Sequence, residues 1–568
     1  MLIHEDLKEN FYKRILDSQQ NVILVANHDL DALCTSVILT DLLERDEVIY
    51  SLVIIKNWSE LEETLNVFRR SSPLFVLINC GGFRSLLDYN IEGLEIFVFD
   101  SQRPIDLANV FANQVVKVIC RTAEIESWNL PSVESVVDMN EDDSEDEEDV
   151  ENREVSRVAL RSIRKRNKEL WEQTRERLIW EYTVKSYVEY PSAVLMLQLA
   201  HSLGKSSAEL SWCACIALTH YHVENFISTQ TYTGICVEAM RTFTRLYAPR
   251  THVKNDSTLR ISFNKELSLP LYSHWTLHQS VIHDINFISS CRLWTQQGAH
   301  KLRETYAKLG IPLSEVNANY TSIATDRRQE IFNIMEKELT AIGAPFATFF
   351  SHFAFSRDYS SADYARLTAL RMDIGPKQDD FRSRFFDTMD FVKRTIWRHG
   401  GNSNETEQAL VQYQKTLESI TQLAYDCMRQ SLFLNTNTFY ALYVPEVPES
   451  EYLLISSHCL NLFMMLALRI FASIRRSYRI KKPLLVSILP KKSITDQQAD
   501  RYCLVSGLMP LQSYMTETER RSLIPRLFSQ LHDDQQLQTK FDAINPHVIY
   551  VKESNRVHFF EKVEHRLL

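Results

Sequence analysis

The stretch that decides the fold is NVILVANHDLDALCTSVILTDLL, residues Asn21 to Leu43. Its first part, Val22 to Ala26, is a short apolar run, as expected of a strand buried on both faces of a parallel sheet. From Ala32 onward the apolar spacing predicts a helix. Asp29 and Asp31 lie between the two, where doubly wound sheets bind their ligands. Two carboxylates this close can hold Mg²⁺ or Mn²⁺, or they can simply cap the helix and stabilise its first turn.

Further apolar runs follow, and helical segments separate them. Strands that alternate with helices predict an α/β fold with a parallel sheet. Asn79 and Asp100 each follow one of these runs. Because the carboxyl ends of parallel strands meet at one edge, we expect both residues to lie beside the two aspartates of the deciding stretch. The runs are Val48–Ile55, Leu74–Ile78, Ile96–Phe99 and Val115–Ile119.

The composition is that of a globular protein with one strongly acidic segment. The chain has 568 residues, of which 45% are apolar and 24% charged, enough for several domains with their own cores. The formal net charge is −10, but nine acids and no bases lie between Asp138 and Asp149, so the rest of the chain is close to neutral. A protein without a basic footprint is not expected to bind DNA through bulk charge.

We expect the acidic segment, residues 138–152, to be a disordered loop, because it has little to bury. Ser144 is followed by three acids, the setting that acid-directed kinases favour, and an unmodified solvated spacer is the alternative. The chain then turns basic, with RSIRKRNK at Arg161 to Lys168. This stretch is either a nuclear localisation signal or the solvated face of a long helix.

From about Tyr182 to Leu434 the pattern is helical, and beyond it strands and helices alternate. The apolar run from Leu460 to Ala472 contains an arginine and is too short to span a bilayer, which predicts a core helix. Val548–Val551 and Val557–Phe560 are expected to close the chain as strands.

The run PFATFF, Pro345 to Phe350, lies in the helical part. Consecutive aromatic residues are hard to bury completely, so Phe349 and Phe350 are candidates for a partner-binding surface. The alternative is that these rings belong to the core.

Four motifs, taken in order, resemble those of the cell division control protein 45 family. The members of this family are replication factors related to the RecJ nucleases of the DHH phosphoesterase superfamily. The resemblance covers essentially the whole chain. It implies a parallel-sheet, RecJ-like DHH domain of α/β class at residues 1–226, a helical insertion at 227–404 and a smaller DHHA1-like α/β domain at 405–568. The motifs are DLDALC at Asp29–Cys34, FVLINCGG at Phe75–Gly82, FVFDSQRP at Phe97–Pro104 and SHWTLHQS at Ser273–Ser280.

The metal-binding motifs of that superfamily are incomplete in this sequence. Two-metal phosphodiester cleavage needs bridging carboxylates, and a neutral asparagine cannot supply one. Loss of the motif histidines also removes ligands that favour Mn²⁺. We therefore interpret these positions as a vestigial site without metal, cofactor or catalysis. They read Asn27, Asp29 and Asp31 in the first motif, Asn79 in the second, Asp100, Ser101 and Gln102 in the third, and His220 in the fourth.

By resemblance, the chain is a non-catalytic scaffold subunit of the eukaryotic replicative helicase, located in the nucleus and required for initiation and elongation of DNA replication. The implied partners are the MCM helicase hexamer, the GINS complex and other replication-fork and origin-firing factors, with single-stranded DNA as a further ligand and no membrane. The alternative is an active metal-dependent DHH-type phosphoesterase or exonuclease that uses Asp29, Asp31 and Asp100.

Overall fold

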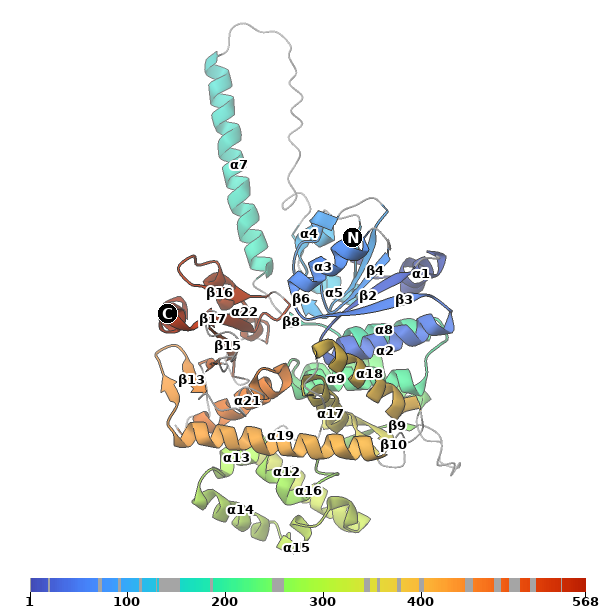
Figure 1. Ribbon diagram of the computed structural model, residues 1–568, viewed down its shortest axis with the longest axis vertical. Helices are drawn as coiled ribbons and strands as arrows, with labels where there is room; N and C mark the ends of the chain where they lie inside the picture. The colour runs from blue at the N-terminus through green and yellow to red at the C-terminus, as the bar shows by residue number, and fades with distance from the viewer. Residues whose placement is uncertain are drawn as a thin grey trace.

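Figure 1 presents a computed structural model of the chain. The acidic segment at 138–152, with Ser144, lies outside the described residues, so its disorder and its phosphorylation stay predictions. The structure describes residues 2–18, 21–69, 74–89, 93–111, 115–128, 130–131, 154–183, 187–247, 260–341, 348–354, 358–374, 380–397, 403–444, 453–474, 482–489, 501–510, 517–542 and 544–567.

A six-stranded parallel sheet forms the centre of the N-terminal part, with the strand order β1-β7-β5-β4-β2-β3. β2 lies inside this sheet, and all six of its residues are buried. The predicted parallel α/β fold is confirmed. The strands are β1 (Leu2–Ile3), β2 (Val22–Asn27), β3 (Tyr50–Ile55), β4 (Leu74–Ile78), β5 (Glu95–Phe99) and β7 (Val116–Ile119).

Helices cover both faces of this sheet. Successive residues of a strand point to opposite faces, so Leu24 and Ala26 join the larger apolar core, whereas Ile23 and Val25 join a smaller one. This double burial explains why the strand is apolar up to Asn27. The larger core takes α2 (Leu30–Arg45), α8 (Ser192–Ser202) and α9 (Ala208–Val223), with η1 (Lys8–Tyr12) and α1 (Lys13–Asp17) beside them, and the smaller core takes α3 (Trp58–Phe68), α4 (Leu107–Phe111) and α5 (Thr122–Ser127).

A small antiparallel ribbon and a long helix follow the sheet. β6 (Gln102–Arg103) pairs with β8 (Tyr187–Val188). This pairing places the segment after β5 next to the segment before α8. Between them in sequence, α7 (Glu154–Thr183) stands away from the body as the long helix at the top of Figure 1. RSIRKRNK lies in this helix, in agreement with its interpretation as part of a long helix.

Residues 227–404, which the resemblance assigns to a helical insertion, are mainly helical where the structure describes them, but they also contain an antiparallel sheet that the sequence did not predict. β10 (Thr348–Ala354) pairs with β9 (Arg260–Glu266) on one side and β11 (Asp358–Ser360) on the other. Phe349 and Phe350 lie in β10, since an aromatic-rich run favours a strand over a helix. Their side chains lie outside what the structure describes.

The helices of the insertion form two groups. One group, between residues 267 and 335, has its own apolar core and makes the lobe at the bottom of Figure 1. The other group includes α17 and α18, which pack against α9 and α2 and so share the larger core. The helices are α10 (Thr229–Ile235), η3 (Cys236–Met240), α11 (Arg241–Leu246), α12 (Leu277–Ile282), α13 (Ile285–Cys291), α14 (Gln296–Lys308), α15 (Leu313–Val316), η4 (Tyr320–Ser322), α16 (Thr325–Ala341), α17 (Ser361–Asp373) and α18 (Phe381–Trp397).

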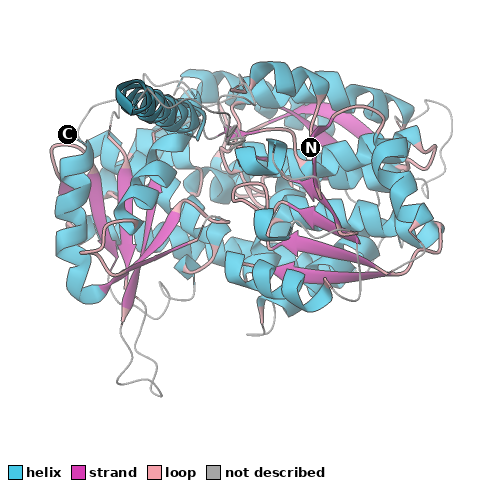
Figure 2. Ribbon diagram, turned by 90° about the horizontal axis from the view of Figure 1, so that it is seen from above, coloured by secondary structure: helices cyan, strands magenta, loops and turns pink. Residues whose placement is uncertain are grey.

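The C-terminal part has a second six-stranded sheet, which lies beside the first (Figure 2). Its strand order is β12-β13-β14-β15-β17-β16, and only β13 and β14 run parallel among these strands. The elements are α19 (Ser403–Arg429), β12 (Phe433–Asn435), β13 (Tyr440–Val444), α21 (Ser457–Ile474), β14 (Leu484–Ile488), β15 (Tyr502–Leu508), α22 (Glu517–His532), β16 (Thr539–Phe541), β17 (Val548–Lys552), η5 (Glu553–Asn555) and α23 (Arg556–Leu567).

Two expectations for this region need correction. α21 has 18 residues, so its length and composition would allow it to cross a membrane, and the argument from length was wrong. The helix is nevertheless 61% buried in the protein and packs against α13, α17 and α19, as a core helix does. The expected strand at Val557–Phe560 is part of α23, because Phe559, Phe560 and Val563 bury one helical face.

Candidate functional site

The carboxyl ends of three neighbouring strands bring polar residues to one edge of the N-terminal sheet. Asp29 and Asp31 follow β2, Asn79 follows β4, and Asp100 and Ser101 follow β5. The predicted convergence of these residues is confirmed. Asn79 is 3% exposed, and its φ of 53° is a conformation that asparagine tolerates better than most residues.

Asn79 joins the two aspartates of the deciding stretch. Its Nδ2 donates to Asp29 Oδ1 at 3.0 Å and to Asp31 Oδ2 at 2.9 Å, while its Oδ1 accepts from Ser192 Oγ at 2.6 Å. Asp29 also caps α2 by accepting from Ala32 N at 2.7 Å. In this arrangement the amide turns hydrogen atoms, not lone pairs, toward the carboxylates.

Asp31 is fully buried and heavily hydrogen-bonded. Besides Asn79, its carboxylate accepts from Ser192 N at 2.8 Å and from Ala193 N at 3.0 Å, at the first turn of α8. The hydroxyl of Tyr221 on α9 donates to Asp31 Oδ2 at 2.9 Å and lies 2.7 Å from Ser101 Oγ. These bonds make Asp31 the point where the sheet, α8 and α9 meet.

Asp100 is hydrogen-bonded to the backbone of the loops that follow β4 and β5. Its carboxylate accepts from Gly82 N at 3.1 Å and from Gln102 N at 3.0 Å. A Cβ at Gly82 would lie 2.7 Å from Asp100 Oδ2, so the close approach requires glycine. Behind this loop the buried Arg103 donates to the carbonyl of Asp100 and forms an ion pair with Glu124.

Burial reduces the negative charge of the cluster. It raises the pKa of Asp29 to about 8, and the charge of Asp31 adds to the shift. Burial also raises the pKa of Asp31, against the hydrogen bonds it accepts, and raises that of Asp100 to about 6. Burial therefore disfavours the charged form of all three carboxyl groups, and the site carries less negative charge than three exposed aspartates would.

The residues do not fit a pair of divalent cations. A bridging ligand must offer lone pairs to both ions, whereas Asn79 donates to both aspartates and so occupies the space between them. Within the described residues, no group of three histidine, cysteine or acidic side chains is placed to hold a metal ion.

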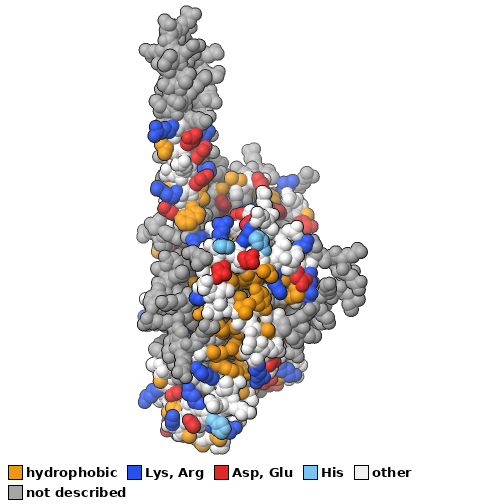
Figure 3. Space-filling model, turned by 90° about the vertical axis from the view of Figure 1, so that its left-hand side faces the viewer, with side chains coloured by type: hydrophobic (Ala, Val, Ile, Leu, Met, Phe, Trp, Pro, Cys, Tyr) orange, Lys and Arg blue, Asp and Glu red, His pale blue; other side chains and the backbone are white. Residues whose placement is uncertain are grey.

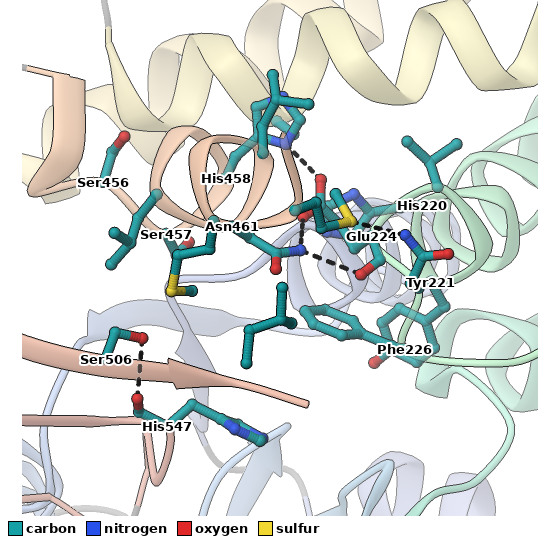
Figure 4. A pocket seen from close by; sticks show the side chains of 18 of the residues that line it. His220, Tyr221, Glu224, Phe226, Ser456, Ser457, His458, Asn461, Ser506 and His547 are labelled. Carbon is teal, nitrogen blue, oxygen red and sulfur yellow. Dashed lines mark hydrogen bonds and ion pairs between the residues drawn. The ribbon is translucent and has the colours of Figure 1, made fainter. Parts of the chain in front are cut away.

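A cavity of about 950 Å³ extends from this edge toward the C-terminal domain. Asp29, Asn79 and Tyr221 line one end, and Ser506 and His547 belong to the other. Figure 4 shows α9 and α21 approaching each other across it.

Glu224, the C-cap of α9, is the main polar link across this cavity. It forms a buried ion pair with His458 of α21, and Asn461 Nδ2 donates to its Oε2 at 2.6 Å and to its carbonyl at 3.1 Å (Figure 4). The backbone N–H of His458 donates to Asp373 Oδ2 at 2.8 Å, and this bond connects α21 to the last residue of α17. The link therefore joins the N-terminal domain, the insertion and the C-terminal domain.

Comparison with known proteins identifies the family. The family model described as CDC45 matches residues 22–154 and 122–566. The chain belongs to the CDC45 family.

Relatives and a solved structure cover most of this CDC45-family chain. It is 25% identical over 573 residues to the cell division control protein 45 homolog of Mus musculus, with 98% of each chain covered. It is 26% identical over 455 residues to the Homo sapiens homolog, covering 76% of this chain and 78% of that one. The crystal structure of CDC45 from Entamoeba histolytica has the same fold, with a TM-score of 0.70, 14% identity and 99% of each chain covered.

The positions assigned from sequence are only partly brought together in this CDC45-family chain. Asp29, Asp31, Asn79 and Ser101 share one hydrogen-bonded network with Tyr221, whereas Asp100 and Gln102 are bonded to each other, the backbone N–H of Gln102 donating to the carboxylate of Asp100. The fourth-motif position was given to His220, yet it is the next residue, Tyr221, that donates to Asp31. His220 is partly buried near Glu224, and desolvation lowers its pKa to about 4.

Sequence reasoning missed three residues that hold the site. Ser192 starts α8, and only the fold brings it next to Asn79. Tyr221 gives no motif signal, although its place on an apolar helix beside His220 marks a polar group that needs a partner. Arg103 was quoted within FVFDSQRP, and its burial beside Glu124 could not be read from the spacing.

Proposed function

We propose that this chain is a non-catalytic scaffold subunit of the eukaryotic replicative helicase, acting in the nucleus with the MCM hexamer, GINS and other replication-fork and origin-firing factors. Membership of the CDC45 family supports a role in DNA replication. The observation that carries the non-catalytic part is the bond of the Asn79 amide to both Asp29 and Asp31. A donor in that position replaces the cations that would otherwise hold the two carboxylates together. Single-stranded DNA is a further proposed ligand.

The competing function is a metal-dependent phosphoesterase that uses Asp29, Asp31 and Asp100. It would need Asn79 to rotate its amide and Asp31 to give up bonds from Ser192, Ala193 and Tyr221. Each buried group left without a partner costs about 1–3 kcal/mol, so the observed network opposes metal binding.

We expect the purified protein to leave labelled single-stranded DNA intact in the presence of Mn²⁺, because the cluster is already satisfied by hydrogen bonds. The assay compares the wild type with an Asp29→Ala variant. This variant lacks one of the two aspartates that would have to bind the metal ions together. Gel separation of the products gives the rate. Cleavage by the wild type that is lost in the variant would support the phosphoesterase and contradict the scaffold.

Phe349 and Phe350 remain proposed partner-binding residues. They are adjacent in β10, paired with Lys265 and Asn264 of β9, and adjacent strand positions belong to opposite faces of a sheet. We therefore expect Phe349→Ser and Phe350→Ser to act differently: one variant should keep its fold and lose co-purification with MCM and GINS. Circular dichroism checks folding. Two folded variants that both assemble normally would rule out this pair as an interface.

A further inference from the structure

The connection between β16 and β17 reaches from the C-terminal domain to the N-terminal sheet. Asp542 Oδ2 accepts a hydrogen bond from the backbone N–H of Trp58, the first residue of α3, at 2.9 Å. Asp542 Oδ1 accepts from the backbone N–H of Ile544 at 2.9 Å, so the same carboxylate also fixes the local shape of this connection. Because α3 begins just beyond the carboxyl end of β3, the contact lies at the edge of the sheet that carries the carboxylate cluster.

Ile544 packs into the core on the α3 side of the N-terminal sheet. It is 8% exposed and belongs to the smaller apolar core, whose other described members all lie within residues 2–187. The C-terminal domain leaves other apolar side chains in solvent, since Leu434 is 50% and Val557 is 68% exposed. Figure 3 shows apolar side chains gathered on the left-hand face of the molecule. The burial of Ile544 is therefore due to its contact with the N-terminal domain.

The same isoleucine leaves little space above the carboxylate edge. A gap of about 10 Å³ remains between Ile544 and the loops that follow β4 and β5. Asn79, Cys80 and Asp100 are among the residues that line it. A gap of this volume has room for about one water molecule, so a phosphate group does not fit there.

This interdomain contact can open without unfolding either sheet. It rests mainly on one hydrogen bond from α3 and on one apolar side chain. β17 keeps its pairing with β15 and β16 inside the C-terminal sheet whether or not the contact is made. The buried ion pair of Glu224 and His458 is a separate link between the domains. Contacts of this small size open at a lower free energy than a whole domain unfolds.

We propose that Asp542 and Ile544 form a releasable clasp, an autoinhibitory contact by which the C-terminal domain closes one side of the carboxylate edge. The clasp opens while both domains stay folded. Its opening widens the gap and gives ligands as large as a phosphate group access to Asn79 and Asp100. The clasp goes beyond the proposed scaffold function, because it depends neither on the partners of the chain nor on metal binding.

Cys80 is a natural reporter for the clasp. It lines the same gap as Ile544 and is 2% exposed, and burial raises the pKa of its thiol. A covered thiol of raised pKa reacts slowly, so release of the clasp should make Cys80 react faster. All ten cysteines of the chain are buried, and the other nine therefore report on opening elsewhere.

The test treats the full chain with N-ethylmaleimide and measures the labelling rate of each cysteine by mass spectrometry of its peptides. Ile544→Ser should raise the rate at Cys80 at least about tenfold and leave Cys503 of the C-terminal sheet unchanged, because only a local contact is lost. Leu537→Ser is the matched control. Leu537 is 5% exposed but belongs to the core of the C-terminal domain, so this variant should accelerate Cys503 and not Cys80.

Asp542→Ala tests the polar half of the clasp. It removes both hydrogen bonds of the carboxylate, so the rate at Cys80 should rise again. The control is Asp534→Ala, since Asp534 pairs with Lys562 inside the C-terminal domain. This variant loses a carboxylate contact of the same domain without touching the N-terminal sheet, and its Cys80 should stay as slow as in the wild type.

Low urea distinguishes release of the clasp from unfolding of the chain. A local opening exposes little surface, so the rate at Cys80 in the wild type should hardly depend on urea below the unfolding transition. The proposal would be overturned if Cys80 stayed as slow in Ile544→Ser and Asp542→Ala as in the wild type. It would also be overturned if these variants accelerated all ten cysteines together, since the contact would then be an inseparable part of the folded core.

Discussion

Asn79→Asp is expected to make the carboxylate cluster respond to Mn²⁺. In EDTA the variant should be less stable than the wild type by about 1–3 kcal/mol, because two buried donors are lost and a third carboxylate faces Asp29 and Asp31. Mn²⁺ should restore this loss, since a ligand that binds only the folded state at 100 times its Kd adds about 2.7 kcal/mol. Thermal unfolding in EDTA and in Mn²⁺ measures both effects.

Asn79→Ala is the control for this experiment. It removes the same donors without adding a carboxylate, so it should be destabilised in EDTA but not rescued by Mn²⁺. Equal responses of the wild type and Asn79→Asp to Mn²⁺ would contradict the idea that the asparagine excludes the cation.

Glu224→Gln is expected to destabilise the protein by about 3–5 kcal/mol, because it leaves the buried charge of His458 without its partner. Glu224 is 4% exposed and His458 is 5% exposed, so solvent screens the pair very little. The loss should appear in urea unfolding as a lower midpoint. The double variant Glu224→Gln, His458→Gln should recover part of it, since two neutral amides can still hydrogen-bond. A double variant as unstable as Glu224→Gln alone would contradict the ion-pair account.

The same pair predicts a pH window for stability. Burial opposes the charge on each residue, but the partner's charge and hydrogen bond outweigh it, so the pKa of His458 is raised and that of Glu224 is lowered. The contribution of His458 is complete below its ordinary pKa of 6.5 and is lost as pH rises through its raised value. The contribution of Glu224 is complete above its ordinary pKa of 4.5 and is lost as pH falls through its lowered value.

The stability difference between the wild type and Glu224→Gln should therefore be largest between about pH 4.5 and 6.5. Taking the difference removes the contributions of other groups, among them Asp29. A difference that stays constant from pH 4 to pH 9 would contradict the assignment of the charges.

The sequence predicted those parts of the fold that are visible in the residue pattern of a single element. β2 is apolar from Val22 to Ala26 and is followed by two aspartates, so both its burial and the position of Asp29 could be predicted. The antiparallel sheet of the insertion could not be predicted, because β9 and β10 are far apart in sequence and pair only in the folded chain. The C-terminal strand was misassigned because a short apolar run fits a strand or a helix face equally well.

The candidate site shows the same limit. Motif positions located Asp29, Asp31, Asn79 and Asp100, since each lies shortly after the end of a strand. The groups that complete the network, Ser192 and Tyr221, come from α8 and α9, more than a hundred residues away. Their role depends on the distance between helices and sheet, which no local pattern encodes.

The most direct test of the central claim is a Mn²⁺ titration of the metal-free wild-type chain, followed by the electron paramagnetic resonance signal of the free ion. If Asn79 replaces the cations between Asp29 and Asp31, the free-ion signal should rise in the protein sample just as it does in buffer. Loss of signal equivalent to two bound ions per chain, abolished by Asp29→Ala, would contradict the account and identify an intact two-metal site.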